Sequence, residues 1–354
     1  MAFNKKSIMK FPSVLLVGHD VLKNIPDICN ELGMSKEAII ITGKTTYGYA
    51  GNKVEMFLKK KGFNVKIFFA ESATLESIAE IERKVKNSKV SSPFFLGIGG
   101  GSKIDIAKIV SYNLKRPFIS VPTIASHDGI ASPRASLKNG KLPISIEAKV
   151  PIAIIADTHV LVKSPYRFLA SGCADVISNL TAVKDWELAH KANNEHFSST
   201  ASTLSKYTAE NIIENAKEIS KGYEKSVWTA IKPILMSGIS MSIAGSSRPA
   251  SGSEHLFSHA LDVIGTSKAL HGEQCGVGTI MMMYLHNGDW EKIRNALKTL
   301  KCPTTAKELG ISEKDLIKAI ILSTKIRKDR YTILNEVKIT KKEAYKIAKV
   351  TKVI

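Results

Sequence analysis

The sequence has little of several features that mark whole classes of protein. Its 354 residues include 4 cysteines, none in a Cys-x-x-Cys pair, which argues against a zinc finger or a disulfide scaffold and favours reduced thiols. We interpret all of them as small buried residues and not as metal ligands: Cys29, Cys173, Cys275 and Cys302. Apolar runs such as residues 280–285 fall far short of the roughly 18 residues of a membrane span. Residues 1–6 carry charge without a following apolar stretch, so we expect no secretory signal, no membrane insertion and a cytoplasmic protein.

Acidic residues are scarce relative to basic ones. The chain has 32 Asp and Glu against 51 Lys and Arg, which gives a formal net charge of +19. Such a surplus is typical of nucleic-acid-binding proteins, but here the lysines are scattered and no aromatic residues are interleaved with them. We therefore expect no nucleic-acid partner, and a basic nucleic-acid-binding protein remains the alternative outside the enzymes. A positive field would instead attract phosphate-bearing cofactors and substrates.

Short β-rich segments alternate with helical segments through the first half of the chain. Buried strands are predicted at residues 13–17, 38–42, 64–69, 94–98, 118–121 and 152–156. The alternation predicts a Rossmann-like α/β fold, a parallel sheet with helices on both faces. Asn139-Gly140 predicts the turn of an inserted hairpin. After about residue 163 the strand patterns stop, so we expect an α/β domain over 1–163 and an all-helical domain over 164–354.

A glycine-rich segment, Gly97-Ile-Gly-Gly-Gly-Ser-Lys-Ile-Asp105, follows the fourth predicted strand. Glycine lets the backbone approach a phosphate closely, and the helix N-terminus adds unpaired N–H groups and a positive dipole. The spacing departs from the standard dinucleotide fingerprint at Ser102, and no P-loop Gly-Lys-Ser/Thr follows. We expect a dinucleotide pyrophosphate here, with a surface turn as the alternative.

A second loop, residues 122–132, follows the fifth predicted strand. Because loops at the carboxyl ends of parallel strands meet at one crevice, we expect this loop to face the same ligand. Its titratable residues are His127 and Asp128. Asp128 is either a substrate contact or a turn-forming aspartate before Gly129.

Three of the 9 histidines lie close together in the second half. His255 and His259 are four residues apart and share one face of a helix, and His271 follows one loop later. Imidazole is the commonest ligand for zinc-like metals, and a catalytic zinc takes three protein ligands. Leu256 replaces the glutamate of the H-E-x-x-H motif. Asp175 is the best carboxylate candidate, with helix capping as its alternative role. Spacing alone leaves open which three of these four residues bind the metal.

Together these motifs resemble the iron- and zinc-dependent polyol dehydrogenases, the glycerol dehydrogenase-like superfamily. The matching segments are Gly99-Gly-Gly-Ser102 with Asp105, residues 120–129, Gly172-Cys-Ala-Asp175, Ser253-Glu-His255-x-x-x-His259-x-x-Asp262, His271-Gly-Glu and residues 330–334. The resemblance covers nearly the whole chain. Within the family, the chain is most similar to archaeal members that reduce dihydroxyacetone phosphate to sn-glycerol 1-phosphate for membrane phospholipid synthesis.

The resemblance implies a role for each matching position. Zinc would be bound by Asp175, His255 and His271. The substrate would contact Asp128, Asp175 and His259. Asp128 and His259 are the expected catalytic residues, and a proton from a zinc-bound water would be relayed through one or the other. NAD(H) or NADP(H) would contact Gly99, Gly100, Gly101, Ser102, Lys103, Ile104, Asp105, Thr123, Ile124, Ala125, Ser126 and Ser132. Zinc is expected to polarise the substrate carbonyl while the reduced nicotinamide delivers hydride to C2.

The end of the second predicted strand bears on cofactor choice. The adenosine ribose is expected at Thr42-Gly-Lys44-Thr45, which contains no acidic residue to take both ribose hydroxyls. Lys44 would pair with a 2′-phosphate, so we expect NADPH to be accepted as well as NADH. Arg248 is the candidate for the substrate phosphate, with a surface arginine as its alternative reading. The rival enzymes are a glycerol dehydrogenase acting on unphosphorylated glycerol and a 3-dehydroquinate-synthase-like enzyme. A homo-oligomer is compatible with the sequence.

Overall fold

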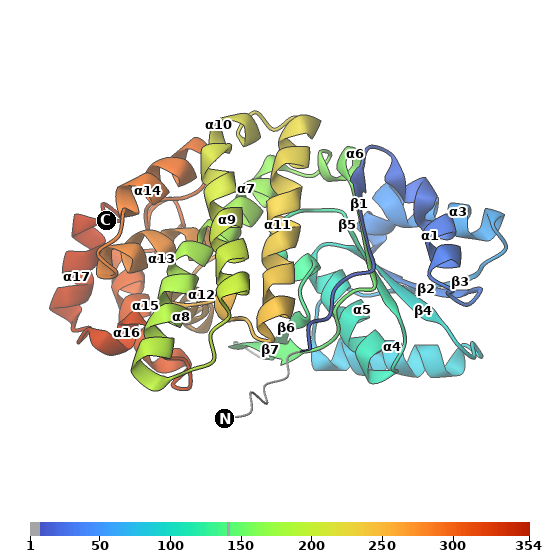
Figure 1. The fold of residues 1–354 in the computed structure, drawn as a ribbon, viewed down its shortest axis with the longest axis horizontal. Coiled ribbons are helices and arrows are strands. Elements are labelled where there is room, and N and C mark those ends of the chain that lie inside the picture. Colours follow the sequence, from blue (N-terminus) through green and yellow to red (C-terminus); the bar gives the residue numbers. More distant parts are fainter. Residues whose placement is uncertain (1–7, 140–141) are drawn as a thin grey trace, which may run out of the picture.

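The computed structural model describes residues 8–139 and 142–354. The expectation about a secretory signal over residues 1–6 and the predicted turn residue Gly140 lie outside the described residues. An α/β half and a helical half lie side by side (Figure 1).

Six parallel strands form the sheet of the first half. In spatial order they are β1 (Val14–Gly18), β8 (Ala153–Asp157), β5 (Phe118–Pro122), β4 (Phe94–Gly99), β2 (Glu37–Thr42) and β3 (Asn64–Phe69). Each predicted strand is present, with ends within one residue of those expected. The predicted α/β class with a parallel sheet is confirmed.

The sheet is covered on both faces because successive strand residues point to opposite sides. Ile39 and Phe95 belong to the core shared with α4 (Leu75–Asn87) and α5 (Gly101–Asn113). Ile40 and Leu96 belong to the core on the other face. That second core includes residues of α1 (Ile25–Glu31) and α3 (Asn52–Lys60).

The order of the strands decides where a ligand can bind. The chain runs outward from β2 to β3 and then returns past β2 to β4. The direction of winding therefore reverses between β2 and β4. In open α/β sheets, ligands bind in the crevice at the carboxyl ends of the strands at such a reversal. The loops that begin at Gly43 and Gly100 flank this position.

The predicted hairpin is formed by β6 (Arg134–Asn139) and β7 (Leu142–Glu147), which pair antiparallel. Short helical segments lie in the loops of both halves: η1 (Val21–Asn24), α2 (Lys44–Thr46), η2 (Tyr47–Gly51), η3 (Asp128–Ile130), α6 (Thr158–Leu161) and η4 (Arg248–Ala250).

From residue 164 onward, the regular elements of the described part of the chain are all helices, as predicted. They are α7 (Tyr166–Ile177), α8 (Asn179–Asn193), α9 (Ser199–Glu214), α10 (Ala216–Ile219), α11 (Glu224–Ala244), α12 (Ser253–Ile264), α13 (His271–Leu285), α14 (Trp290–Thr299), α15 (Glu313–Ile326), α16 (Ile333–Glu336) and α17 (Lys341–Val350). The expected boundary near residue 163 falls between α6 and α7. One hydrophobic core nevertheless continues from α4 and α5 into these helices, so the division into two domains stays a prediction.

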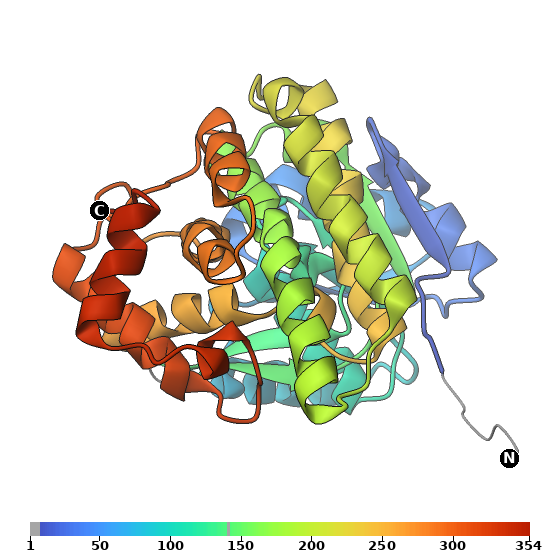
Figure 2. The same cartoon turned by 60° about the vertical axis from the view of Figure 1, so that its left-hand side comes forward.

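Helix α11 is long and apolar enough to cross a membrane by length and composition. In the fold, 72% of that apolar window is buried. Figure 2 shows α11 (gold) beside α9 (yellow-green), and the two helices pack against each other. Because α11 is packed inside the protein, its apolar composition is that of a core helix.

Helix α7 approaches the loop after β5 so closely that Gly172 has no room for a side chain. A methyl group there would lie 2.1 Å from the carbonyl oxygen of Ala125. We expect Gly172→Ala to lower the free energy of unfolding by about 1–3 kcal/mol, because the backbone must shift to admit the methyl group. Urea unfolding measures it. Gly48→Ala is the matched control, since a methyl group there meets no atom within 4 Å. Equal losses in the two variants would contradict this account of the packing.

Candidate metal and dinucleotide site

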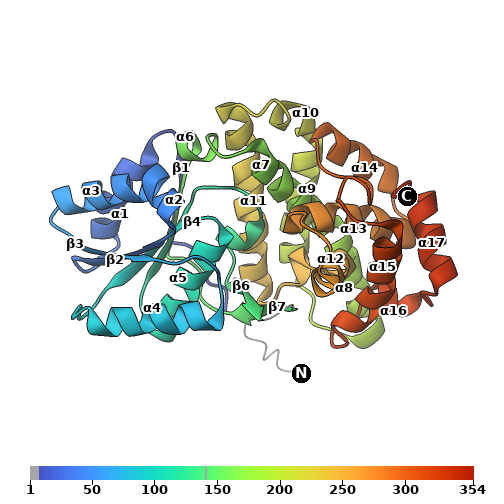
Figure 3. The same ribbon diagram turned by 180° about the vertical axis from the view of Figure 1, so that it is seen from behind.

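Three helices bring the predicted metal ligands together. Asp175 lies near the end of α7, His255 in the first turn of α12 and His271 at the start of α13. Helix α13 packs against both α7 and α12, which is visible from behind (Figure 3). The Nε2 atoms of His255 and His271 each lie 3.7 Å from Oδ1 of Asp175. The helix packing thus directs two imidazoles at one carboxylate oxygen.

The charge state of these groups fits a divalent cation. Oδ1 of Asp175 is buried and has no hydrogen-bond partner among the described residues. Burial raises the pKa of Asp175 to about 7, against the opposing effect of a hydrogen bond from Asp128. Burial also lowers the pKa of His255 and His271, which keeps both rings neutral. A metal would supply the positive charge that this carboxylate lacks, and neutral imidazoles and a carboxylate are its usual ligands.

Neighbouring side chains orient the two imidazoles. Nδ1 of His255 lies 2.9 Å from Oε1 of Glu254, and Nδ1 of His271 lies 3.1 Å from Oγ of Ser258. With Nδ1 engaged, Nε2 of each ring is left to face Asp175. Partners of this kind fix the tautomer and the direction of a ligating imidazole. Sequence reasoning missed Glu254 and Ser258 as orienting residues, although each is within three residues of a predicted ligand.

Cys275, which was not expected among the metal ligands, lies within the ligand group, and His259 lies at its edge. The ring of His259 is 6.4 Å from that of His255 and 6.1 Å from that of His271, centroid to centroid. Sγ of Cys275 lies 3.6 Å from Nε2 of His271. Cys275 therefore joins Asp175, His255 and His271 in a group whose candidate ligand atoms lie within 4.8 Å of one another. Cys275 is buried as predicted, and burial raises the pKa of its thiol, which keeps the thiol neutral.

Asp128 lies directly beside this group. Its backbone N–H donates to Oδ2 of Asp175 at 3.0 Å, and its own Oδ2 accepts a hydrogen bond from the Ser237 hydroxyl at 2.7 Å. Burial, reinforced by the negative charge of Asp175, raises the pKa of Asp128 well above its usual range. The raised pKa favours the protonated form of this carboxyl group, the form that can donate a proton.

The glycine-rich segment, residues 97–105, lies against the loop between β5 and β6 that contains Asp128. Gly99 has φ 155°, which a residue with a side chain rarely adopts, and a methyl group on Gly101 would lie 2.1 Å from Nε2 of His127. The backbone N–H of Thr123 donates to the carbonyl of Gly99 at 3.0 Å. Since α5 begins at Gly101, the first N–H groups of this helix lie just beyond β4, where a pyrophosphate would bind.

Some predicted cofactor contacts have their side chains engaged within the protein. Asp105 accepts a hydrogen bond from the Ser136 N–H and lies 3.5 Å from Nζ of the buried Lys108. Lys108 in turn donates to the carbonyl oxygens of Gly129 and Arg134. The Ser132 hydroxyl donates to the same two carbonyls. These groups hold the β5–β6 loop in position, and their direct contact with a cofactor stays a prediction.

Arg248 fits neither role expected for it. It is buried, with 4% of its surface exposed, so it is not a surface arginine. Its guanidinium group donates to both carboxylate oxygens of Glu195 and to the carbonyl of Tyr331. With these donors occupied, Arg248 is not free to bind a substrate phosphate.

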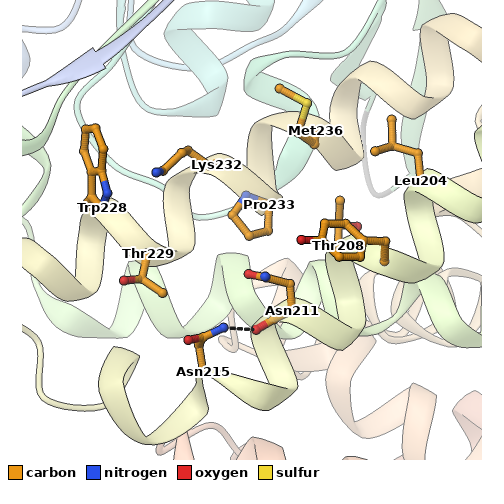
Figure 4. A pocket seen from close by; sticks show the side chains of 10 residues that line it. Leu204, Thr208, Asn211, Asn215, Trp228, Thr229, Lys232, Pro233 and Met236 are labelled. Carbon is orange, nitrogen blue, oxygen red and sulfur yellow. Dashed lines mark hydrogen bonds between the residues drawn. The ribbon is translucent and has the colours of Figure 1, made fainter.

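A pocket of about 390 Å³ lies elsewhere, between α9 and α11. Figure 4 shows it with Trp228, Lys232, Met236 and Leu204 among its lining side chains. Nζ of Lys232 lies 3.9 Å from the centre of the Trp228 ring. None of the lining residues is a histidine, cysteine or carboxylate, so the pocket lacks the groups that the predicted chemistry needs.

Comparison with known proteins shows the family to which this chain belongs. The sequence pattern of iron-containing alcohol dehydrogenases matches residues 16–165. Glycerol-1-phosphate dehydrogenase (NAD(P)+) of Methanosarcina mazei is 50% identical over 100% of this chain and 99% of its own length. The enzyme of the same name from Picrophilus torridus is 49% identical over 100% of both chains. The crystal structure of glycerol dehydrogenase from Schizosaccharomyces pombe superposes with a TM-score of 0.82 at 19% identity, covering 98% of this chain and 91% of that one.

Removing the metal should expose the cost of the buried Asp175 carboxylate. Its raised pKa means that metal-free protein loses stability as the pH rises from about 4 to about 7, because the ionised group lacks a partner. A bound divalent metal removes that cost. Saturating zinc should therefore raise the melting temperature of chelator-treated protein more at about pH 8 than at about pH 5.5.

Differential scanning calorimetry at the two pH values measures this difference. Asp175→Asn is the matched control and should make the difference in the zinc effect between the two pH values smaller. A zinc-induced increase of equal size at both pH values would contradict the assignment of Asp175.

Proposed function

The chain belongs to the glycerol-1-phosphate dehydrogenases of the iron-containing alcohol dehydrogenase family, and we propose that it reduces dihydroxyacetone phosphate to sn-glycerol 1-phosphate at a zinc site. NADH or NADPH is the reductant. The observation that carries the proposal is the hydrogen bond from Asp128 to Asp175. This bond holds the candidate metal ligands against the loop between β5 and β6. The same loop packs on the glycine-rich segment after β4, so the ketone and the nicotinamide would meet between the two.

The chain's own residues have distinct tasks in this reaction. A bound metal would supply Lewis-acid polarisation of the ketone, and the reduced nicotinamide would supply hydride. Asp175, His255 and His271 would hold the metal. Asp128, whose pKa is raised by burial, would deliver a proton from its carboxyl group to the substrate oxygen. His259, at the edge of the ligand group, would contact the substrate.

Zinc is the metal we propose because two imidazoles and one carboxylate are a usual catalytic zinc set with a fourth position left for substrate. The same set also binds ferrous iron, which the family's name records. A cytoplasmic location is part of the proposal. It is supported by the 4 free, buried cysteines and by the use of a nicotinamide cofactor. The product would serve membrane phospholipid synthesis, as the resemblance implies.

An assay of net cofactor oxidation tests the function. With dihydroxyacetone phosphate the wild-type enzyme should consume NADH or NADPH, lose activity with a chelator and form sn-glycerol 1-phosphate by chiral analysis. Asp175→Asn should lower kcat/KM at least about 100-fold, or ~2.7 kcal/mol, because one ligand oxygen is lost. Asp27→Asn, on the surface, is the control and should retain full activity.

Each other outcome has a definite meaning. Equal rates with unphosphorylated dihydroxyacetone would indicate a glycerol dehydrogenase. Turnover without net cofactor oxidation would indicate an enzyme like 3-dehydroquinate synthase. Activity retained in Asp175→Asn would falsify the metal assignment while leaving the substrate assignment open to the same assay.

Cofactor choice should depend on the end of β2. Lys44 is exposed and begins α2 directly after that strand, and a methyl group on Gly43 would lie 2.9 Å from Cε of Lys103. Two lysines therefore flank the expected ribose position. We expect Lys44→Ala to raise KM for NADPH about tenfold (~1.4 kcal/mol) and KM for NADH less than about twofold, since only NADPH carries the 2′-phosphate.

Steady-state kinetics with both cofactors measures this effect. Lys53→Ala, on the exposed surface of α3, is the matched control and should leave both KM values unchanged. A wild-type preference for NADH of about 100-fold or more would contradict the assignment of Lys44.

A further inference from the structure

A second group of metal-ligating side chains lies where the first half meets α11. His19 follows β1, His159 lies in α6 and Glu224 is the first residue of α11. One candidate ligand atom from each lies within 4.8 Å of the other two. Figure 1 shows the end of β1 and α6 beside the upper end of α11.

This group is separate from the candidate active site. The contact of α11 with that site is made by Ser237, which bonds to Asp128. Ser237 is thirteen residues beyond Glu224, which at 1.5 Å per residue is about 20 Å along the helix. No step of the proposed reaction uses His19, His159 or Glu224.

We propose that His19, His159 and Glu224 form a second site for a divalent metal of the zinc class. Two imidazoles and one carboxylate are a usual zinc ligand set, and water would complete the tetrahedron on the solvent side. The ion would join three elements that are far apart in the sequence, two from the α/β half and one from the helical half.

The distances between the groups suit one ion. Nδ1 of His19 lies 2.8 Å from Oε1 of Glu224. Two ligands of a tetrahedral zinc lie roughly 3.3 Å apart, given metal–ligand bonds of about 2.0–2.1 Å. The His19 side chain is 59% exposed, so it is free to move by the difference of about half an ångström. The ring of His159 lies edge-on to that of His19, at 4.9 Å between centroids, and its imidazole makes no hydrogen bond within the described residues.

An outer layer of hydrogen-bonding groups is already in place. Nε2 of His19 lies 3.2 Å from Oδ2 of Asp20, which leaves Nδ1 to face Glu224. The Thr158 hydroxyl donates to Oε1 of Glu224 at 2.5 Å. A carboxylate behind a ligating imidazole and a hydrogen bond to a ligating carboxylate are the usual supports of a protein metal site.

The test counts metal on the full-length enzyme. After equilibration with excess zinc and gel filtration, elemental analysis should find one zinc fewer per chain in His159→Gln than in wild type. Glu224→Gln should lose the same ion. His196→Gln, an exposed histidine outside the group, is the matched control and should keep the wild-type content. Turnover by His159→Gln should equal that of wild type, which also establishes that the variant is folded.

Copper provides a second readout. With chelator-treated protein, the electron paramagnetic resonance spectrum of added Cu²⁺ should contain one bound species in wild type that is missing in His159→Gln. The test uses the difference in zinc content between wild type and variant. Its result is therefore independent of which metal is bound by Asp175, His255 and His271. Equal zinc content in wild type and His159→Gln would overturn the proposal and leave His19 and Glu224 as an ion pair only.

Discussion

The hydrogen bond from the Asp128 backbone to Oδ2 of Asp175 is the contact on which the candidate site depends. Asp128 belongs to the loop after β5, and Asp175 belongs to α7 in the helical half. The same loop places His127 against Gly101 at the start of α5. One short segment of backbone therefore sets the distance between the glycine loop and the candidate metal ligands. The buried Lys108 supports that segment by bonding the carbonyl oxygens of Gly129 and Arg134.

Close helix packing makes this contact possible. A methyl group on Gly272 would lie 1.9 Å from the carbonyl oxygen of Ser171, so α13 meets α7 nearly backbone to backbone. This packing also buries ionisable groups that have few partners. Burial raises the pKa of Asp175 and Asp128 and lowers the pKa of His255 and His271. All four shifts oppose charge in the metal-free site. A divalent cation reverses the balance for Asp175, because it restores the missing partner.

Different parts of the structure could be foreseen to different degrees. The strands agree with expectation because continuous apolar runs bounded by glycine and polar residues are a local signal. The helical spacing of His255 and His259 indicated a shared face, and they do share one. Yet the structure sets Cys275, and not His259, nearest the other candidate ligands. Glu254 and Arg248 could not be assigned from sequence, since their partners Thr181 and Glu195 lie more than fifty positions away.

The sequence by itself determined the α/β class, the position of the glycine loop and the residue types available for metal, cofactor and substrate. Those properties follow from periodicity and composition, which act over a few residues. Only the tertiary structure decided which side chains meet, because the loop between β5 and β6, helix α7 and the pair α12 and α13 make contacts between residues more than forty positions apart. It also decided their protonation, because burial is a property of the packed protein and not of the chain.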